Sequence, residues 1–228
     1  MKHMENTVNN NGYDYVDLGL PSGTLWATCN VGASKPSDAG LYFQWGDTQG
    51  YTADQVGIGK GKKQFSIDWI DYYTKEQVGM VKPFTFADYK FCINGSFTNF
   101  SKYTTPGETL ELEDDAAKIL MGGDWHIPTP EQIIELIDNT TTSLTVQDGV
   151  KGRLFTSKSD TSKYIFIPAA GNAWDGSVRN SGSLGSVWSS MLSTDYAGYG
   201  QYLYFYSGGV YLGGDDRCDG VSVRGVIG

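Results

Sequence analysis

The clearest pattern of apolar and polar positions lies in the last third of the chain, where side chains alternate with a period of two. Over Tyr202–Tyr206 the sequence YLYFY sets Leu203 and Phe205 between three tyrosines. Since successive side chains of a strand point to opposite faces, this alternation predicts a strand with one core face and one aromatic face. After a Ser-Gly-Gly turn, Val210 continues the core set and Tyr211 the aromatic set.

Shorter runs predict strands before this segment. The stretch Tyr15–Ala33 reads as a β-hairpin around a Pro-Ser-Gly turn, and Leu154–Gly171 reads as two strands joined by Ser-Lys-Ser-Asp. Residues 140–152, just before that second hairpin, are predicted to form a polar loop. Residues 83–97 are predicted to form a pair of short strands. We expect the strand at Tyr15–Leu18 to share a sheet with Val221–Val226, closing the fold through its two ends.

Two segments have helical features. Glu111–Met121 (ELEDDAAKILM) reads as a short helix whose acidic first turn is solvated and suits the helix dipole. In the second segment, Thr129 is a predicted N-cap followed by Pro130 at the first helical position. Its buried stripe is predicted to be Ile133, Ile134, Leu136 and Ile137. The nearby His126 is one of two histidines, and the other, His3, lies in the polar N-terminal stretch. No histidine-based dyad or metal site can be assembled from them, so we assign His126 a structural role.

Composition narrows the function. The 228 residues include 30 glycines and 14% aromatics, which is typical of a loop-rich fold. A net charge of -9 argues against nucleic acid as a partner. Cys29, Cys92 and Cys218 form no CxxC pair, so we expect neither a metal site nor a disulfide framework, and no cofactor. No run is apolar enough to insert into a membrane, and the start MKHMENTVNNNG shows no signal peptide.

The domain organisation follows from these features. We expect a disordered tail over 1–12 and a single domain over 13–228. Within that domain, the irregular stretch at about 50–105 reads as an insertion. A C-terminal region at about 172–221 differs from the rest of the domain in its residue types.

The residue alphabet of the last third is unusual. After Lys163 there is no Lys and no Glu, and from Tyr196 the unpatterned positions hold Tyr, Gly, Asp, Leu and Cys. All five are reached from an Asn codon by changing its first two bases, whereas Lys, Glu, Gln, Met and Trp are not. The segments GSLGSVWSS, LYFYSGGV and GVSVRGV surround these unpatterned positions. In both respects the last third resembles the variable regions of proteins diversified by retroelements, and the resemblance implies a variable region at about 172–221. Trp174, Met191 and Gln201 lie outside that alphabet.

Two further segments carry a second resemblance. The opening hairpin with DAGLYFQWGDT (Asp38–Thr48), and the segment GGDWHIPTPEQIIELIDN (Gly122–Asn139), resemble the FISUMP domains of gut bacterial surface proteins. Those domains belong to the C-type-lectin-like group that includes formylglycine-generating enzymes. The resemblance implies an α+β fold: a loop-rich C-type-lectin-like domain with few short helices and a small, mostly antiparallel sheet.

Three functions compete under these resemblances. The first is a non-enzymatic binding protein on a phage particle or bacterial surface, with its diversified surface directed at a macromolecular target such as a cell-surface protein or glycan. The second, a formylglycine-generating enzyme, requires two nearby C-terminal cysteines, and only Cys218 is present. The third, a calcium-dependent lectin, lacks the Glu-Pro-Asn, Gln-Pro-Asp and Trp-Asn-Asp tripeptides. A FISUMP-type adhesion or carbohydrate-binding domain without diversification is the main alternative to the first.

The first function predicts a flat or shallow aromatic site, because Tyr and Gly are typical of antibody-like recognition surfaces. The tyrosines of the alternating segment are expected to form one patch, bordered by loop residues at the same end of the domain. Display in many copies would raise avidity. The candidate ligand-binding residues are Trp174, Asp175, Arg179, Tyr199, Tyr202, Tyr204, Tyr206, Tyr211, Leu212, Asp215, Asp216, Cys218 and Asp219.

Overall fold

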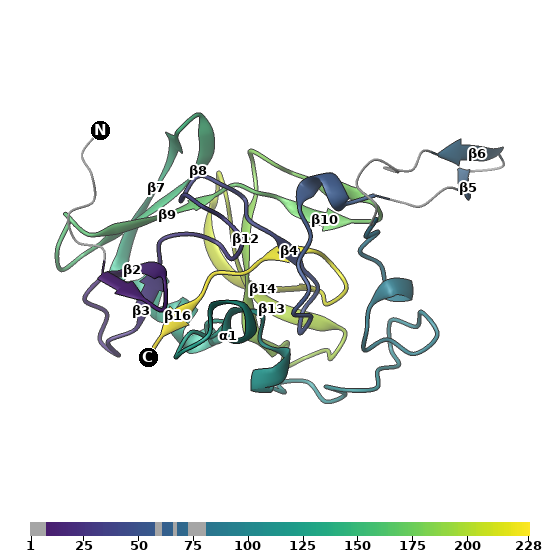
Figure 1. Ribbon diagram of the computed structural model, residues 1–228, viewed down its shortest axis with the longest axis horizontal. Helices are drawn as coiled ribbons and strands as arrows, with labels where there is room; N and C mark the ends of the chain where they lie inside the picture. The colour runs from purple at the N-terminus through teal and green to yellow at the C-terminus, as the bar shows by residue number, and fades with distance from the viewer. Residues whose placement is uncertain (1–7, 58–60, 66–67, 73–80) are drawn as a thin grey trace.

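The computed structural model describes residues 8–57, 61–65, 68–72 and 81–228 (Figure 1). The chain is mostly β, with 38% of residues in strands and 13% in helices, arranged as several sheets and a half-barrel. The expected α+β class is therefore wrong. The described residues contain only two α-helices, both short, so the layers that bury the core are sheets and loops.

The elements have the following bounds. The helices are α1 (Ala116–Met121) and α2 (Pro130–Asn139), with single 3₁₀ turns at Ala53–Gln55, Phe86–Asp88 and Leu112–Asp114. The strands before α1 are β1 (Val8–Asn10), β2 (Tyr13–Asp17), β3 (Leu25–Ala27), β4 (Tyr42–Phe43), β5 (Gly61–Phe65) and β6 (Asp68–Tyr72). Those after α2 are β7 (Thr140–Gln147), β8 (Val150–Ser157), β9 (Tyr164–Pro168), β10 (Asn172–Trp174), β11 (Ser177–Arg179), β12 (Gly185–Leu192), β13 (Tyr199–Tyr206), β14 (Gly209–Asp216), β15 (Val221–Ser222) and β16 (Val226–Ile227).

A five-stranded sheet of order β14-β13-β12-β15-β4 lies in the middle of the molecule (Figure 1). Its one parallel pair is β12 with β15. Strand β12 is buried along nearly its whole length, and its neighbouring residues point into different cores. Val187 packs in a cluster with α2, β8 and β9, while Trp188 packs in a second cluster on the other side. A sheet covered on both faces needs apolar residues in both alternating sets.

A second sheet, of order β1-β2-β3-β16, joins the two ends of the described chain. Val8–Asn10 pairs with Tyr13–Tyr15 around Asn11 and Gly12, both at positive φ, so the expected disordered tail is wrong from Val8 onward. The rest of that tail, 1–7, lies outside the described residues. Strand β2 shares this sheet with Val226, as expected, but Val221 belongs to the five-stranded sheet.

A third sheet, β7-β8-β9, lies at the upper left of Figure 1. The polar loop expected at 140–152 is wrong, because these residues form β7, a tight turn and the start of β8. Asp148 (φ 51°) and Gly149 (φ 82°) occupy the turn, and an Asp-Gly pair is a strong signal for such a hairpin. The next hairpin, β8 to β9, is confirmed.

The two helices begin where local sequence favours them. Thr129 and Gln132 form a reciprocal capping box at the start of α2, with Pro130 at the first position. Ile133 and Leu136 are fully buried, but Ile134 is 45% exposed, so the predicted stripe was too wide. The other predicted helix is interrupted at Asp115, whose side chain caps α1 by accepting a hydrogen bond from the Lys118 amide.

The region 50–105 is irregular over the part that the structure describes, which leaves out residues 58–60, 66–67 and 73–80. The strands β5 and β6 form a hairpin that extends from the body of the molecule at the right of Figure 1. The pair of short strands expected at 83–97 is wrong. That stretch instead contains a 3₁₀ turn and one isolated bridge, between Cys92 and Phe100.

Two arginines are fully buried in the core. The Arg224 guanidinium donates hydrogen bonds to the Asn30 Oδ1 atom and to the carbonyl of Phe166, and burial lowers its pKa to about 10. Arg217 donates to the Tyr89 hydroxyl and to the Tyr103 carbonyl. Because Arg217 lies inside the predicted variable region, that region contains framework positions that hold the core together.

Candidate ligand-binding surface

The central feature of the candidate site is the hairpin of β13 and β14. Its eight cross-strand pairs run without interruption from Tyr199↔Asp216 to Tyr206↔Gly209. Leu203 and Phe205 are fully buried, as the alternation predicted, and Phe205 packs against Phe155 of β8 at 6.3 Å. The even-numbered side chains of β13 therefore lie on the opposite face.

Four rings meet on that opposite face, and we call Tyr202, Tyr204, Tyr206 and Tyr211 the tyrosine cluster. Ring centroids lie 5.1 Å apart for Tyr202 and Tyr204, and 6.4 Å apart for Tyr204 and Tyr206, with nearly parallel planes. Across the strands, Tyr211 lies 5.4 Å from Tyr204 and 5.7 Å from Tyr206. Aromatic side chains in such contact form a stiff, amphipathic surface with little rotamer entropy left to lose on binding.

The tyrosine cluster emerges from the core. Tyr202 is only 9% exposed and belongs to the cluster of Trp45, Trp188 and Tyr103, whereas Tyr206 is 44% exposed. Tyr204 lies between these extremes. The expectation that all of these tyrosines face solvent is therefore wrong for Tyr202, although its ring still lines the surface described below.

Glycines opposite the tyrosines let the rings lie flat. A Cβ atom on Gly213, which pairs with Tyr202, would lie 2.7 Å from the Tyr204 Cε1 atom. A Cβ atom on Gly209 would lie 2.7 Å from the Tyr211 hydroxyl oxygen. Both distances are shorter than van der Waals contact, so larger residues would force the rings out of their stack.

Three members of the tyrosine cluster, Tyr202, Tyr204 and Tyr206, form one wall of a groove with a volume of about 760 Å³. The other walls come from the end of the β7–β8 hairpin and from the loop after β11. They contribute Leu144, Val146, Lys151, Asn180, Ser183 and Leu184. The site is therefore hollowed, and the expected flat or shallow surface is wrong at this place.

Arg153 connects two walls of the groove. It lies on β8, and its guanidinium donates to the Thr142 Oγ1 atom of β7 at 2.9 Å and to the Tyr206 carbonyl of β13 at 2.8 Å. Arg153 is 6% exposed and lies over the Phe205 ring. These contacts hold the β7–β8 hairpin at a fixed distance from the tyrosine strand.

The other candidate residues do not join the tyrosine cluster. Trp174 and Arg179 form their own pair on the β10–β11 hairpin, with the guanidinium carbon 4.0 Å from the ring centroid, and Asp175 lies at its turn. Tyr199 packs against Tyr196 at the far end of β13. Leu212 packs against the core on the Leu203 side. The single patch expected from the sequence is thus divided among separate surfaces.

The three C-terminal acidic candidates, Asp215, Asp216 and Asp219, lie close enough together to affect one another's pKa. Burial raises the pKa of Asp215, and burial and then Asp215 raise that of Asp216. Asp219 is 4% exposed, and burial, reinforced by Asp215 and Asp216, raises its pKa to about 8. Cys218 is 1% exposed, and burial raises the pKa of its thiol, which makes it unreactive. Cys218 and Asp219 therefore do not border a surface patch, contrary to expectation.

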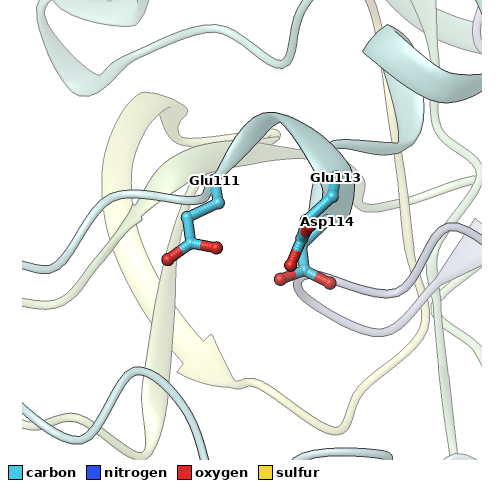
Figure 2. Close-up of side chains that lie close together, drawn as sticks. All are labelled: Glu111, Glu113 and Asp114. Carbon is cyan, nitrogen blue, oxygen red and sulfur yellow. The ribbon is translucent and has the colours of Figure 1, made fainter.

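The carboxylates of Glu111, Glu113 and Asp114 point into one space, as Figure 2 shows. Lys102 satisfies all three, with its Nζ atom 2.6 Å, 3.1 Å and 2.6 Å from the nearest carboxylate oxygens. Lys90 lies 2.7 Å from the other oxygen of Asp114. Burial alone would raise the pKa of Asp114, but hydrogen bonds from Lys102 and Lys90 hold it below its usual value. The arrangement is an ion-pair network in which the Lys102 ammonium group occupies the position that a metal ion would take.

Comparison with known proteins adds no relative: no family model, no curated protein and no solved structure matches the chain. No helix within the described ranges is long and apolar enough to cross a membrane.

His126 has its two ring nitrogens within hydrogen-bond distance of the carbonyls of Ile127 and Gly228, which suits the structural role assigned to it.

The groove walls of β7 and β8 were missed at the sequence level. Their signal was present in TTTSLTVQ-DG-VKGR, where apolar residues alternate with polar ones around an Asp-Gly turn. The high content of Thr and Ser led instead to the prediction of a loop.

Proposed function

We propose that the chain is a non-enzymatic ligand-binding protein, and that the tyrosine cluster is the centre of its binding surface. The observation that carries this proposal is the stacked, partly exposed arrangement of four tyrosines on one face of β13 and β14. Exposed aromatic residues on a soluble surface mark interfaces, and tyrosine is enriched among residues that dominate binding energy.

The proposed target is macromolecular, a protein or glycan on a cell surface, bound without calcium. The interleaving of buried Leu203 and Phe205 with outer tyrosines supports diversification by a retroelement, because outer positions can change while the core stays intact. Under this proposal the protein is displayed in many copies on a phage particle or bacterial surface. A reverse-transcriptase gene beside an Asn-rich template repeat would support the genetic part, and a neighbourhood without them would contradict it.

The binding part is tested with a ligand obtained by screening bacterial surface fractions. Tyr204→Ala and Tyr211→Ala should each weaken binding by about thirtyfold, the effect of losing roughly 2 kcal/mol at an anchor. Tyr13→Ala is a matched control, since Tyr13 is 38% exposed and Tyr211 39%, but it lies on β2 in another sheet. Binding should be unaffected by a chelator.

Two results would contradict the proposal. If Tyr204→Ala and Tyr211→Ala bind as the parent protein does, the tyrosine cluster is not the site. Loss of binding on chelation would instead favour a metal-dependent lectin.

A further inference from the structure

The edge strand β7 is unusual among the strands that border the groove. It is at the edge of its sheet, eight residues long, and pairs with β8 in an unbroken register without a bulge. Its sequence TTTSLTVQ contains no charged residue and no proline. Natural edge strands are normally protected by at least one of these features, because an unprotected edge pairs with other chains.

Strand β7 also exposes two apolar side chains to solvent. Leu144 is 53% exposed and Val146 is 60% exposed, and both line the groove opposite the tyrosine cluster. Thr145 lines it too. Because β7 is the outer strand of its sheet, its backbone amides and carbonyls that point away from β8 have no strand partner among the described residues.

The charge of the groove is opposite to that of the whole protein. The protein carries a net charge of -9, yet within the part of the chain that the structure describes no Asp or Glu lines the groove. The charged lining residue is Lys151, which is exposed and forms no ion pair with a described residue. An acidic group on a ligand would be attracted here and repelled over most of the remaining surface.

We propose that an extended, acidic peptide segment of the ligand binds in this groove as an additional strand beside β7. This inference rests on the proposed function and names the chemical class of its ligand. Backbone hydrogen bonds to the free edge supply affinity, as in other cases of strand addition. Alternate apolar side chains of the peptide insert between Leu144, Val146 and the tyrosine cluster, and a carboxylate lies near Lys151. A glycan would leave the peptide groups of the β7 edge without matching partners.

The groove is preorganised for such a segment. Arg153 holds β7 and β13 together through Thr142 and the Tyr206 carbonyl, so the walls need not close on binding. Ordering one flexible peptide against a rigid groove costs less than ordering both partners.

The test uses a phage-displayed library of short linear peptides selected on the intact protein, alongside a glycan array. Selected peptides should contain alternating apolar residues and at least one Asp or Glu. The double variant Leu144→Ser, Val146→Ser should weaken their binding by about tenfold or more. Lys151→Met should weaken it by no more than about fivefold, because an exposed ion pair contributes little. Val150→Ser is the matched control, since Val150 is an exposed apolar residue of β8 outside the groove lining.

Methylation of alternate peptide amide nitrogens should abolish binding in one register and spare it in the other, because strand addition uses every second amide. The inference is overturned if methylation at every position leaves binding intact, if the double variant binds the peptides normally, or if only glycans bind. These failures are distinct from failure of the proposed function. A surface ligand lost by Tyr204→Ala but unaffected by the Leu144 and Val146 substitutions would keep the tyrosine site and exclude the added strand.

Discussion

Tyr202 and Tyr206 lie on the same face of the same strand, yet their replacement should have very different effects on stability. Tyr202 is 9% exposed, and its ring lies 5.9 Å from Trp188 and 5.1 Å from Tyr204. Tyr206 is 44% exposed and contacts other members of the tyrosine cluster only at its inner side. Their pairing makes a direct test of where the binding surface ends and the core begins.

We expect Tyr202→Ala to lower the free energy of unfolding by about 3 kcal/mol or more, the usual cost of emptying a buried aromatic site. Tyr206→Ala should lower it by less than about 1 kcal/mol, because exposed substitutions have small effects. Tyr202→Phe should cost under about 1 kcal/mol, since the loss comes from the ring and the Tyr202 hydroxyl has no hydrogen-bond partner among the described residues.

Urea unfolding followed by tryptophan fluorescence measures these differences, with the transition midpoint compared at constant slope. Equal losses for Tyr202→Ala and Tyr206→Ala would refute the inference that the tyrosine cluster emerges from the core. A graded result would mean that position 202 needs a large ring for stability, whereas position 206 tolerates a small side chain.

Three further results are expected. The raised pKa of Asp219, about 8 against an ordinary value of 3.8, means that the folded state keeps a proton that the unfolded state releases, so stability should fall as pH rises from about 4 to 8. The slope should reach about 1.4 kcal/mol per pH unit at most, and Asp219→Asn should flatten this dependence in urea titrations. Arg217→Lys should cost about 2 to 4 kcal/mol in the same assay because an ammonium cannot reproduce its several hydrogen bonds, whereas exposed Arg179→Lys should cost under about 0.5 kcal/mol. The melting temperature should not respond to calcium or chelator while Lys102 neutralises the Asp114 cluster, but Lys102→Met should become calcium-stabilised. A calcium response of the parent protein would contradict the ion-pair interpretation.

Features that depend on neighbouring residues were predicted correctly from the sequence. The start of α2 follows from Thr129, Pro130 and Gln132, which satisfy the free amides of a helix end within one turn. That Leu203 and Phe205 share one face of a strand follows from its period of two, and the fold buries that face. The helix start and the shared face both depend on bond geometry over a few residues.

The mostly β architecture was not predicted in this way, and the expected α+β class is wrong. That class rested on resemblance, and the sequence between 140 and 152 was assigned to a loop because threonine and serine are common in both loops and exposed strands. Strand β7 exists because β8 pairs with it over eight residues, and the Asp148 and Gly149 turn sets that register.

The candidate surface shows the same division. Alternation placed Tyr202, Tyr204 and Tyr206 on one face, but only the tertiary structure decided that Tyr202 is covered by Trp45 and its neighbours while Tyr206 reaches solvent. Period identifies a face, whereas burial depends on what packs over it. The groove, too, arises only in the folded protein, because it needs Arg153 of β8 and Tyr206 of β13, which are 53 residues apart in sequence, to come together through a hydrogen bond.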